Sequence, residues 1–222
     1  MKNSYLISAI VIVAVLLGVF LRSTKTEAPI IVSSESAKSI SAVSDGSYEL
    51  SISDSFISWE GEYLTSLSEK GTFKLSSGNL VVEGGLITSG EFTIDMNSIE
   101  SIPYKDMLVN HLKSKDFFEV ETYPTAKFVL KKMIPSSEEG AKIGRFVIAG
   151  DLTIKGITQP VSFIVTMTQD GKVLGATASF AINRADWEVK YNSPTFFKDL
   201  GDKIIRDAVS VGLDLKAVMV LQ

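Results

Sequence analysis

The chain has 222 residues, of which 45% are hydrophobic and 22% charged, enough for one sizeable domain with an appendage but not for a second core. Its formal net charge is −4 and it contains no run of Lys or Arg, so nucleic acid is not expected as a partner, because neutralising phosphates needs a clustered positive surface. The absence of Cys excludes disulfides, thiolate metal sites and a Cys nucleophile.

Residues 5–21 form an apolar run of 17 residues without a charge. A run of this length and position predicts a membrane-directed helix, and we assign residues 1–22 to a signal peptide or a transmembrane anchor. The small-residue pattern at residues 26–28 is similar to a cleavage site, but Pro29 is a poor residue after a cut. Cleavage and retention both stay open. In either case we expect the domain in the cell envelope, outside the cytoplasm, on the periplasmic or extracytoplasmic side.

Residues 23–47 are rich in Ser and poor in aromatic residues, which predicts a flexible linker. A short edge strand through residues 30–32 is the alternative. The folded domain is then expected over residues 48–222.

Beyond residue 48, apolar residues alternate with polar or charged ones over many short stretches, as is typical of strands with one buried face. The apolar members of this pattern are Leu50, Ile52, Phe73, Leu75, Phe92, Ile94, Met96, Phe128, Leu130, Phe146, Ile148, Leu152, Ile154, Val161, Phe163, Val165, Met167, Phe180, Ile182, Val209, Val211, Leu213, Leu215 and Met219. Turn signals occur at residues 77–79, 83–85, 139–140, 155–156 and 169–171. The sequence therefore predicts a mainly β domain with antiparallel strands.

One segment, residues 103–114, breaks the period of two. Pro103 suits the first turn of a helix, and Tyr104, Leu108 and Leu112 recur at a spacing of four. We therefore expect one short amphipathic helix here. The pair of Phe residues that follows is expected to dock this helix onto the sheet.

Strands with one apolar face, interrupted by one helix, close as a barrel or fold as a sandwich. Closure is favoured because it removes exposed strand edges. The stretch between residues 180 and 206 bridges two of the strands and is unusually rich in aromatic and charged side chains for a connection.

Three separated blocks of the sequence form a distinctive ordered set. The first, residues 110–128, contains NHLKS, DFF and YP ahead of Phe128. The second, residues 150–161, reads GDLTIKGITQPV, and the third, residues 182–203, contains INRADW, FF and LGDK. In this order the blocks resemble the YceI-like family of lipid-binding barrels. The resemblance covers roughly residues 47–221, and three ordered blocks are far more specific than one short motif.

The resemblance implies an extended antiparallel, lipocalin-like β-barrel of about eight strands, whose lumen takes an isoprenoid chain. This chain departs from the family in one place. Many members carry a His shortly before the Gly-x-Phe of an early strand, where this chain has Ser68, Glu69 and Lys70. A head-group contact made by that His in relatives is therefore not carried over.

No catalytic residue is predicted. The chain has a single His, His111, and no Gly-x-Ser-x-Gly motif, so a Ser-His-Asp triad lacks its nucleophile elbow. We interpret His111 as a packing or helix-surface residue. With no second His and no Cys, no metal site is predicted either. The domain is not expected to be an enzyme or to need a cofactor, apart from a bound isoprenoid lipid as its ligand.

Ligand binding is the positive hypothesis, although inward-facing residues of a small barrel are either core filling or pocket lining. The resemblance favours a pocket. The candidate ligand-binding residues are Phe73, Phe92, Ile94, Phe128, Leu130, Phe163, Val165, Phe180, Ile182, Asn183, Arg184 and Trp187.

Arg184 is the most interesting polar candidate, together with its neighbour Asn183. One interpretation is that Arg184 binds a head group such as a diphosphate or a quinone oxygen. The other is that it pairs with Asp186, Asp199 or Asp202 and fixes the long connection.

Four aromatic residues of the connection also allow two interpretations. Trp187, Tyr191, Phe196 and Phe197 form either a lid over the lumen or a satellite cluster against the outer wall. Trp59 is interpreted as strand packing only.

These observations predict a protein that binds, sequesters or transports an isoprenoid lipid or isoprenoid quinone in the cell envelope, with the membrane contacted through residues 5–21. The alternative is a packed barrel that serves as a structural or stress-response interaction module and has no lipid ligand. The two differ in whether side chains fill the lumen to ordinary packing density. The sequence predicts neither the ligand's head group and tail length nor the oligomeric state.

Overall fold

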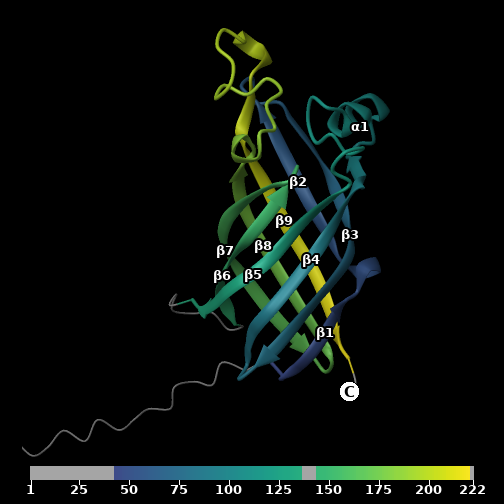
Figure 1. Cartoon of the computed structure of the whole chain (residues 1–222), viewed down its shortest axis with the longest axis vertical. Helices are drawn as coiled ribbons and strands as arrows, with labels where there is room; N and C mark the ends of the chain where they lie inside the picture. Colours follow the sequence, from purple (N-terminus) through teal and green to yellow (C-terminus); the bar gives the residue numbers. More distant parts are fainter. Residues whose placement is uncertain (1–42, 137–143, 221–222) are drawn as a thin grey trace, which may run out of the picture. The chain divides into compact units, whose positions relative to one another are not determined.

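The computed structural model describes residues 43–136 and 144–220. The chain divides into two compact units, residues 1–37 and 38–222, and all described residues belong to the second. Figure 1 shows its strands and its helix α1, Asp106–Lys113. The strands are β1 Gly46–Leu50, β2 Phe56–Tyr63, β3 Ser68–Glu83, β4 Leu86–Ser101, β5 Thr125–Pro135, β6 Arg145–Ile154, β7 Ile157–Asp170, β8 Val173–Asn183 and β9 Ile205–Met219. The short 3-10 helices are η1 Ile52–Asp54, η2 Arg184–Trp187 and η3 Gly201–Lys203.

The strands form one closed, antiparallel barrel with eight positions around its wall. Around the barrel the order is β3, β2, β9, β8, β7, β6, β5, β4 and back to β3. The short strand β1 shares a position with β2, because both lie between β3 and β9. The predicted antiparallel barrel of about eight strands with one helix is therefore confirmed.

The wall position shared by β1 and β2 is interrupted by η1, and Ser55 bridges the break. Ser51 N donates to Lys216 O on β9 at 2.7 Å. Ser55 Oγ accepts from Lys216 N at 3.0 Å and donates to Lys216 O at 3.3 Å. The Ser55 side chain thus takes the place of the backbone ladder, and the wall stays hydrogen-bonded across the interruption.

Alternation along the strands places one face of each strand in the lumen. On β3, Phe73 and Leu75 are buried, whereas Lys74 and Ser76 are exposed. The predicted apolar positions are buried or half-buried in this way, with the exception of Ile52, which lies in η1 and is exposed. The predicted alternation of apolar and polar residues therefore supplies the side chains of the core.

Three of the predicted turns are confirmed as hairpin turns, namely residues 83–85 between β3 and β4, 155–156 between β6 and β7, and 169–171 between β7 and β8. The turn predicted at residues 77–79 is wrong, because these residues lie inside β3. A Cβ on Gly78 would overlap the side chain of Leu50, so this glycine permits a close approach between strands. The signal at residues 139–140 lies outside the described residues.

Helix α1 lies between β4 and β5 and confirms the predicted helix, but with a different start. It begins at Asp106, so Pro103 precedes the helix and does not lie in its first turn. Tyr104 also precedes it and is 65% exposed, whereas the buried residues of the helix are Val109 and Leu112. The predicted spacing of four is confirmed for Leu108 and Leu112, which pack on the core, and only the inclusion of Tyr104 was wrong.

Most of the predicted N-terminal segments lie outside the described residues, including the membrane-directed residues 5–21. The barrel begins with Gly46 in β1, so the last two residues of the predicted linker belong to the sheet. Within residues 43–136 and 144–220, no helix is long and apolar enough to cross a bilayer.

Gly71 on β3 lies where β2, β3 and β4 pack tightly. A Cβ there would overlap the carbonyl oxygen of Glu100 and would lie 2.8 Å from Cζ2 of Trp59. We expect Gly71→Ala to lower the free energy of unfolding in urea by about 3 kcal/mol, because a backbone oxygen of a paired strand cannot move cheaply. The matched control is Gly61→Ala on β2, where an added Cβ meets nothing within 4 Å. A similar loss in both variants would contradict this account.

Candidate ligand-binding site

Inward-facing side chains enclose an apolar cavity of about 170 Å³ in the half of the barrel next to α1, which we call the larger cavity. Every strand from β2 to β9 contributes to its walls. Nine of the predicted ligand-binding residues line it, namely Phe73, Phe92, Ile94, Phe128, Phe163, Phe180, Ile182, Arg184 and Trp187. Seven of these nine lie on strands, where the strand periodicity identified them as inward-facing.

A second apolar cavity of about 90 Å³, the smaller cavity, occupies the half of the barrel next to β1. The predicted residues Leu130 and Val165 line this cavity, not the larger one. Four residues line both cavities, namely Phe92, Phe128, Phe163 and Leu213. The two cavities therefore adjoin along the barrel.

Where the two cavities adjoin, four Phe rings form a row that we call the aromatic partition. The ring centroids of Phe92 and Phe128 are 5.1 Å apart, and those of Phe128 and Phe163 are 5.9 Å apart. Phe163 and Phe180 stack at 4.2 Å with nearly parallel planes. The rings come from β4, β5, β7 and β8 and so extend across the lumen.

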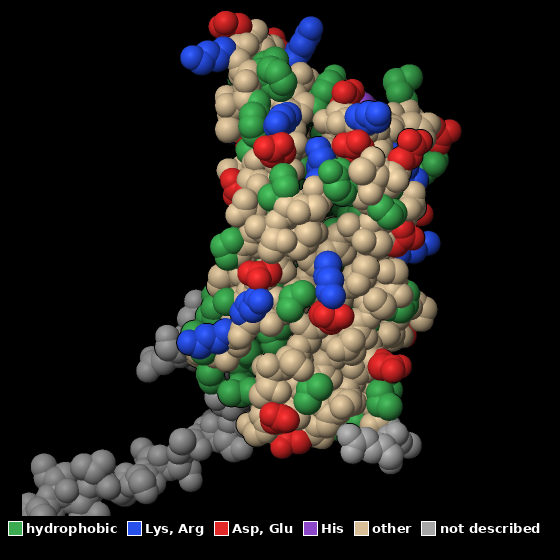
Figure 2. All heavy atoms as spheres, in the orientation of Figure 1, with side chains coloured by type: hydrophobic (Ala, Val, Ile, Leu, Met, Phe, Trp, Pro, Cys, Tyr) green, Lys and Arg blue, Asp and Glu red, His purple; other side chains and the backbone are tan. Residues whose placement is uncertain are grey.

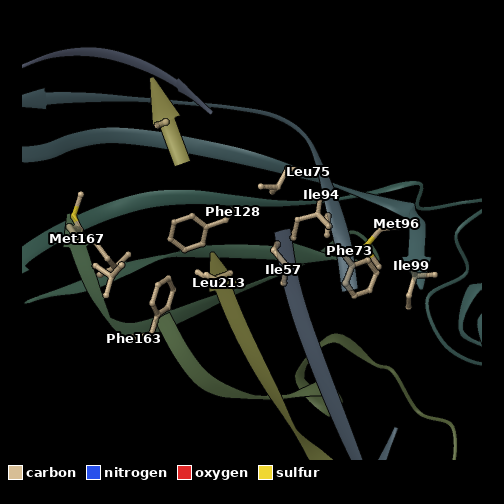
Figure 3. Close-up of a cluster of buried hydrophobic side chains, with 14 of the residues drawn as sticks. Ile57, Phe73, Leu75, Ile94, Met96, Ile99, Phe128, Phe163, Met167 and Leu213 are labelled. Carbon is tan, nitrogen blue, oxygen red and sulfur yellow. The ribbon is translucent and has the colours of Figure 1, made fainter. Parts of the chain in front are cut away.

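The partition sits midway along the buried cluster. Figure 3 shows Phe128 and Phe163 between Met167 on one side and Ile99 on the other. The intervening strand β6 carries Gly150 at this level, and a Cβ there would lie 2.6 Å from Cε2 of Phe128. The missing side chain is therefore what gives the Phe128 ring its place in the row.

Two segments cover the end of the larger cavity nearest α1. The helical cover, residues 106–118, places Leu108, Leu112 and two Phe side chains in the lining. The expected docking of this Phe pair is confirmed, since the ring of Phe118 packs edge-to-face on Phe73 with centroids 6.0 Å apart. The connection, residues 184–204, supplies the rest of the cover.

The connection is held on the β6–β7 hairpin by its own polar groups. Trp187 is only 2% exposed, lines the larger cavity and donates from Nε1 to Leu152 O at 3.0 Å. Gln159 Nε2 donates to Asp186 O at 3.0 Å. The GDLTIKGITQPV block thus serves as the platform on which the connection rests.

The two covers touch through an aromatic cluster. The ring of His111 lies edge-to-face on Tyr191 with centroids 4.5 Å apart, and Phe117 lies 5.2 Å from Tyr191. His111 Nε2 also lies 3.1 Å from Asp116 Oδ2. His111 is therefore a packing residue between the covers, as interpreted from the sequence.

The four aromatic residues of the connection do not act as one group. Trp187 lines the lumen and Tyr191 joins the two covers. Phe196 and Phe197 are 39% and 48% exposed, so they are part of neither the lining nor a buried satellite cluster. The lid interpretation thus describes the first two residues and is wrong for the last two.

Arg184 is buried and makes several hydrogen bonds to backbone carbonyls. Its Nη1 donates to Val189 O at 2.7 Å, and its Nη2 donates to Ile205 O at 3.0 Å. Its Nε donates to Arg206 O at 3.2 Å. Burial lowers the pKa of Arg184, and the carboxylate of Asp207 opposes that shift. The guanidinium therefore fixes both ends of the connection, and a head group would have to compete with these bonds.

The carboxylate partner of Arg184 differs from those predicted. The nearest carboxylate is Asp207, whose Oδ1 lies 3.4 Å from Nη2, instead of Asp186, Asp199 or Asp202. The pairing of β8 with β9 brings the first turn of the connection next to residue 207, although the two are far apart in sequence. Thr195 Oγ1 donates to the other oxygen of Asp207 at 2.7 Å.

Asn183 lines neither cavity. It is exposed at the end of β8, because alternation turns Ile182 inward and Asn183 outward. Its Oδ1 accepts from Ala185 N at 3.1 Å and its Nδ2 donates to Asp186 Oδ1 at 3.1 Å. Its role in the structure is to cap η2.

Many lining residues were not among the predicted ligand-binding residues, including five in β2 and four in the helical cover. Trp59, interpreted as strand packing, lines the larger cavity together with Ile57. Its indole Nε1 is buried and has no hydrogen-bond partner within the described part of the chain. The signal was the shared parity of Ile57, Trp59 and Tyr63, which Gly61 interrupts.

The described residues hold no group of three or more His, Asp or Glu side chains that could bind a metal ion. The guanidinium of Arg184 and the indole Nε1 of Trp187 are engaged with backbone carbonyls, whereas the indole Nε1 of Trp59 is left without a partner in the described part of the chain. The arrangement can therefore bury a hydrocarbon but offers little for charge-based recognition.

We expect Arg184→Ala to lower the free energy of unfolding by about 4 kcal/mol, because it leaves three carbonyls and the Asp207 carboxylate without their partner. Arg206→Ala is the matched control, since Arg206 is exposed and its ion pair with Glu62 contributes at most about 1 kcal/mol. Thermal and urea unfolding measure the stability of both variants. An Arg184→Ala protein of unchanged stability would contradict the structural role assigned here.

Comparisons with known sequences agree with this architecture. Residues 48–217 match the model of the YceI-like domain. A UPF0312 protein of Pseudomonas putida is 28% identical over 141 residues, which cover 61% of this chain and 71% of that protein. A UPF0312 protein of Photorhabdus laumondii is 38% identical over 95 residues, covering 42% of this chain and 45% of that protein.

Two solved structures share the fold. BcnA of Burkholderia cenocepacia superimposes with a TM-score of 0.63 at 23% identity, covering 76% of this chain and 99% of that one. A polyisoprenoid binding domain from Saccharophagus degradans, implicated in plant cell wall breakdown, superimposes with a TM-score of 0.61 at 18% identity, covering 78% of this chain and 98% of that one. With a family match over most of its length, the chain belongs to the YceI-like domain family.

Proposed function

We propose that this domain binds the tail of an isoprenoid lipid or isoprenoid quinone inside the barrel and sequesters or carries it within the cell envelope, without making or breaking a bond. The observation that carries the proposal is the pair of adjoining apolar cavities along the lumen. The structural relative from Saccharophagus degradans, a polyisoprenoid binding domain, supports the choice of ligand class.

The size of the cavities favours a ligand over the packed-barrel alternative. Protein interiors hold few voids larger than a water molecule, whose share of liquid volume is about 30 Å³. The cavities of about 170 and 90 Å³ exceed that limit several times. Apolar cavities of about 150 Å³ stay dry and accept small hydrocarbons. The lumen is therefore better suited to a hydrocarbon than to water.

The energetics favour long tails. Burying one isoprene unit contributes roughly 3 kcal/mol gross, counting about 0.8 kcal/mol per CH₂-sized group. Association costs about 4–15 kcal/mol in lost freedom of motion. A tail of one or two units therefore binds weakly, whereas several units end to end bind tightly.

Intrinsic fluorescence offers a direct binding test, because the chain has two Trp residues and both, Trp59 and Trp187, line the larger cavity. We expect decylubiquinone to quench this fluorescence strongly and to saturation. Trp59→Phe and Trp187→Phe should each remove part of the signal while changing the dissociation constant by less than about threefold. An unchanged spectrum at saturating quinone would refute binding in the lumen.

A lumen-filling variant provides the matched control for this test. Val161→Phe combined with Val211→Phe adds bulk to the larger cavity from β7 and β9. Ser162→Phe combined with Ser210→Phe adds the same bulk to exposed positions of the same strands. We expect the inward pair to weaken quinone binding at least about tenfold and the outward pair to leave it unchanged. Equal effects would indicate binding elsewhere on the protein.

The aromatic partition predicts how affinity depends on tail length. In a series of ubiquinones with geranyl, geranylgeranyl and octaprenyl tails, affinity should rise by about tenfold or more with each lengthening step. Phe128→Leu shortens a ring that lines both cavities, so it should strengthen binding of the octaprenyl ligand relative to the geranyl one. Phe146→Leu, a buried change outside both linings, is the control. Equal affinities along the series would contradict tail burial.

A further inference from the structure

Large apolar side chains are exposed at one end of the barrel. In this up-and-down topology, the β2–β3, β4–β5 and β8–β9 connections all emerge at the end that carries α1, as Figure 1 shows for α1 and the β8–β9 connection. Among the described residues, seven of the fourteen large hydrophobic side chains that are exposed belong to these connections. These seven, which we call the apolar tips, are Leu64, Leu67, Ile102, Tyr104, Met107, Phe196 and Phe197.

The most exposed large hydrophobic residues of the described chain are among the apolar tips. Met107, Leu67 and Tyr104 are 87%, 67% and 65% exposed, whereas Val218 and Ile134 near the opposite end are 43% and 42% exposed. Figure 2 shows hydrophobic side chains on the surface at this end, interspersed with charged ones. Exposed large apolar side chains are thus more numerous and more exposed at the α1 end than at the opposite end.

The connections that carry the apolar tips also contribute residues to the lining of the larger cavity or adjoin strands that do. The connections that carry the tips also supply the cover of that cavity, and Met107 is the sequence neighbour of Leu108, which lines it. The β2–β3 connection likewise follows Tyr63, the last residue of β2, and leads into β3, whose second residue is Glu69; both residues line the cavity. Exposed tips and residues of the cavity lining are therefore neighbours along these connections.

The charges around the tips cancel. Residues 64–67, 102–124 and 184–204 together hold seven Lys or Arg and eight Asp or Glu side chains. Such a surface has no strong attraction for an anionic partner. The tips are also spread over three separate connections with charged residues between them, which does not form the contiguous apolar patch of a protein interface. Aliphatic and aromatic side chains among balanced charges fit the interfacial layer of a bilayer.

We propose that the α1 end of the barrel is a docking face for a lipid bilayer. The apolar tips enter the headgroup layer, and a lipid tail passes between the bilayer and the larger cavity without crossing water. Because the charges cancel, docking is driven by apolar insertion, so zwitterionic lipid suffices and added salt has little effect. The passage of a tail rests on the proposed function, whereas docking itself does not.

The test uses residues 38–222, which form a compact unit containing the whole barrel and lack the apolar run at residues 5–21. Co-sedimentation with phosphatidylcholine vesicles measures docking. Met107→Asp, Leu67→Asp and Phe197→Asp should each weaken it by about tenfold. Val218→Asp and Ile134→Asp, near the opposite end, should not; their exposure of 43% and 42% is matched by Phe197 at 48%. Unchanged docking of the tip variants, or equal weakening by the controls, would overturn the proposal.

Two further measurements separate docking from ligand binding. Without vesicles, the tip variants should bind decylubiquinone as tightly as the unmodified domain, judged by Trp quenching. With vesicles that contain octaprenyl ubiquinone, the rate of quinone uptake should fall in proportion to docking. Normal docking with no quinone binding would refute the proposed function and leave the docking face standing. If the unmodified domain binds quinone normally but does not dock to vesicles, the docking face is refuted and the proposed function stands.

A second copy of the chain is the competing occupant of this face. Sedimentation velocity without lipid shows whether the domain is a monomer or a dimer and so distinguishes a second copy from a bilayer as the occupant. A monomer whose tip variants lose vesicle docking supports the proposal. A dimer that the tip variants dissociate, together with no vesicle binding, would assign the face to self-association instead.

Discussion

Closure of the sheet is the constraint on which the rest of this structure depends. Because β3 pairs with β2 on one side and β4 on the other, the wall has no free edge, and every inward side chain has only the lumen to pack into. Large rings meet at the aromatic partition, whereas smaller residues such as Ala126 and Val161 leave space beside it. The empty volume therefore follows from where large and small residues fall along the strands.

A barrel also needs its ends closed, and here one buried cation contributes much of that closure. The connection between β8 and β9 is long, and its two ends lie side by side where β8 pairs with β9. Arg184 presents several donors in one plane and reaches carbonyls at both ends of the connection. The same residue is attractive as a head-group ligand when only the sequence is seen, because a buried Arg in a polar motif has both uses.

The wall of the site was predictable from sequence because a strand has a strict period of two, so residues such as Phe163 and Phe180 are assigned to a face without further information. The cover was predicted only in part, because the helix begins three residues after Pro103 and so leaves Tyr104 outside it and exposed. The partner of Arg184 depends on strand pairing between distant residues. The sequence alone did not show whether Gly78 lies in a turn or at a close contact between strands, because both situations favour glycine.

Tyr191 contacts both His111 and Phe117, so the helical cover and the connection share one aromatic cluster. Neither segment can swing away without breaking contacts that also hold the other. Elements coupled in this way open as one cooperative unit and not by independent fraying. A molecule could then leave the lumen only during such a single, all-or-none opening event.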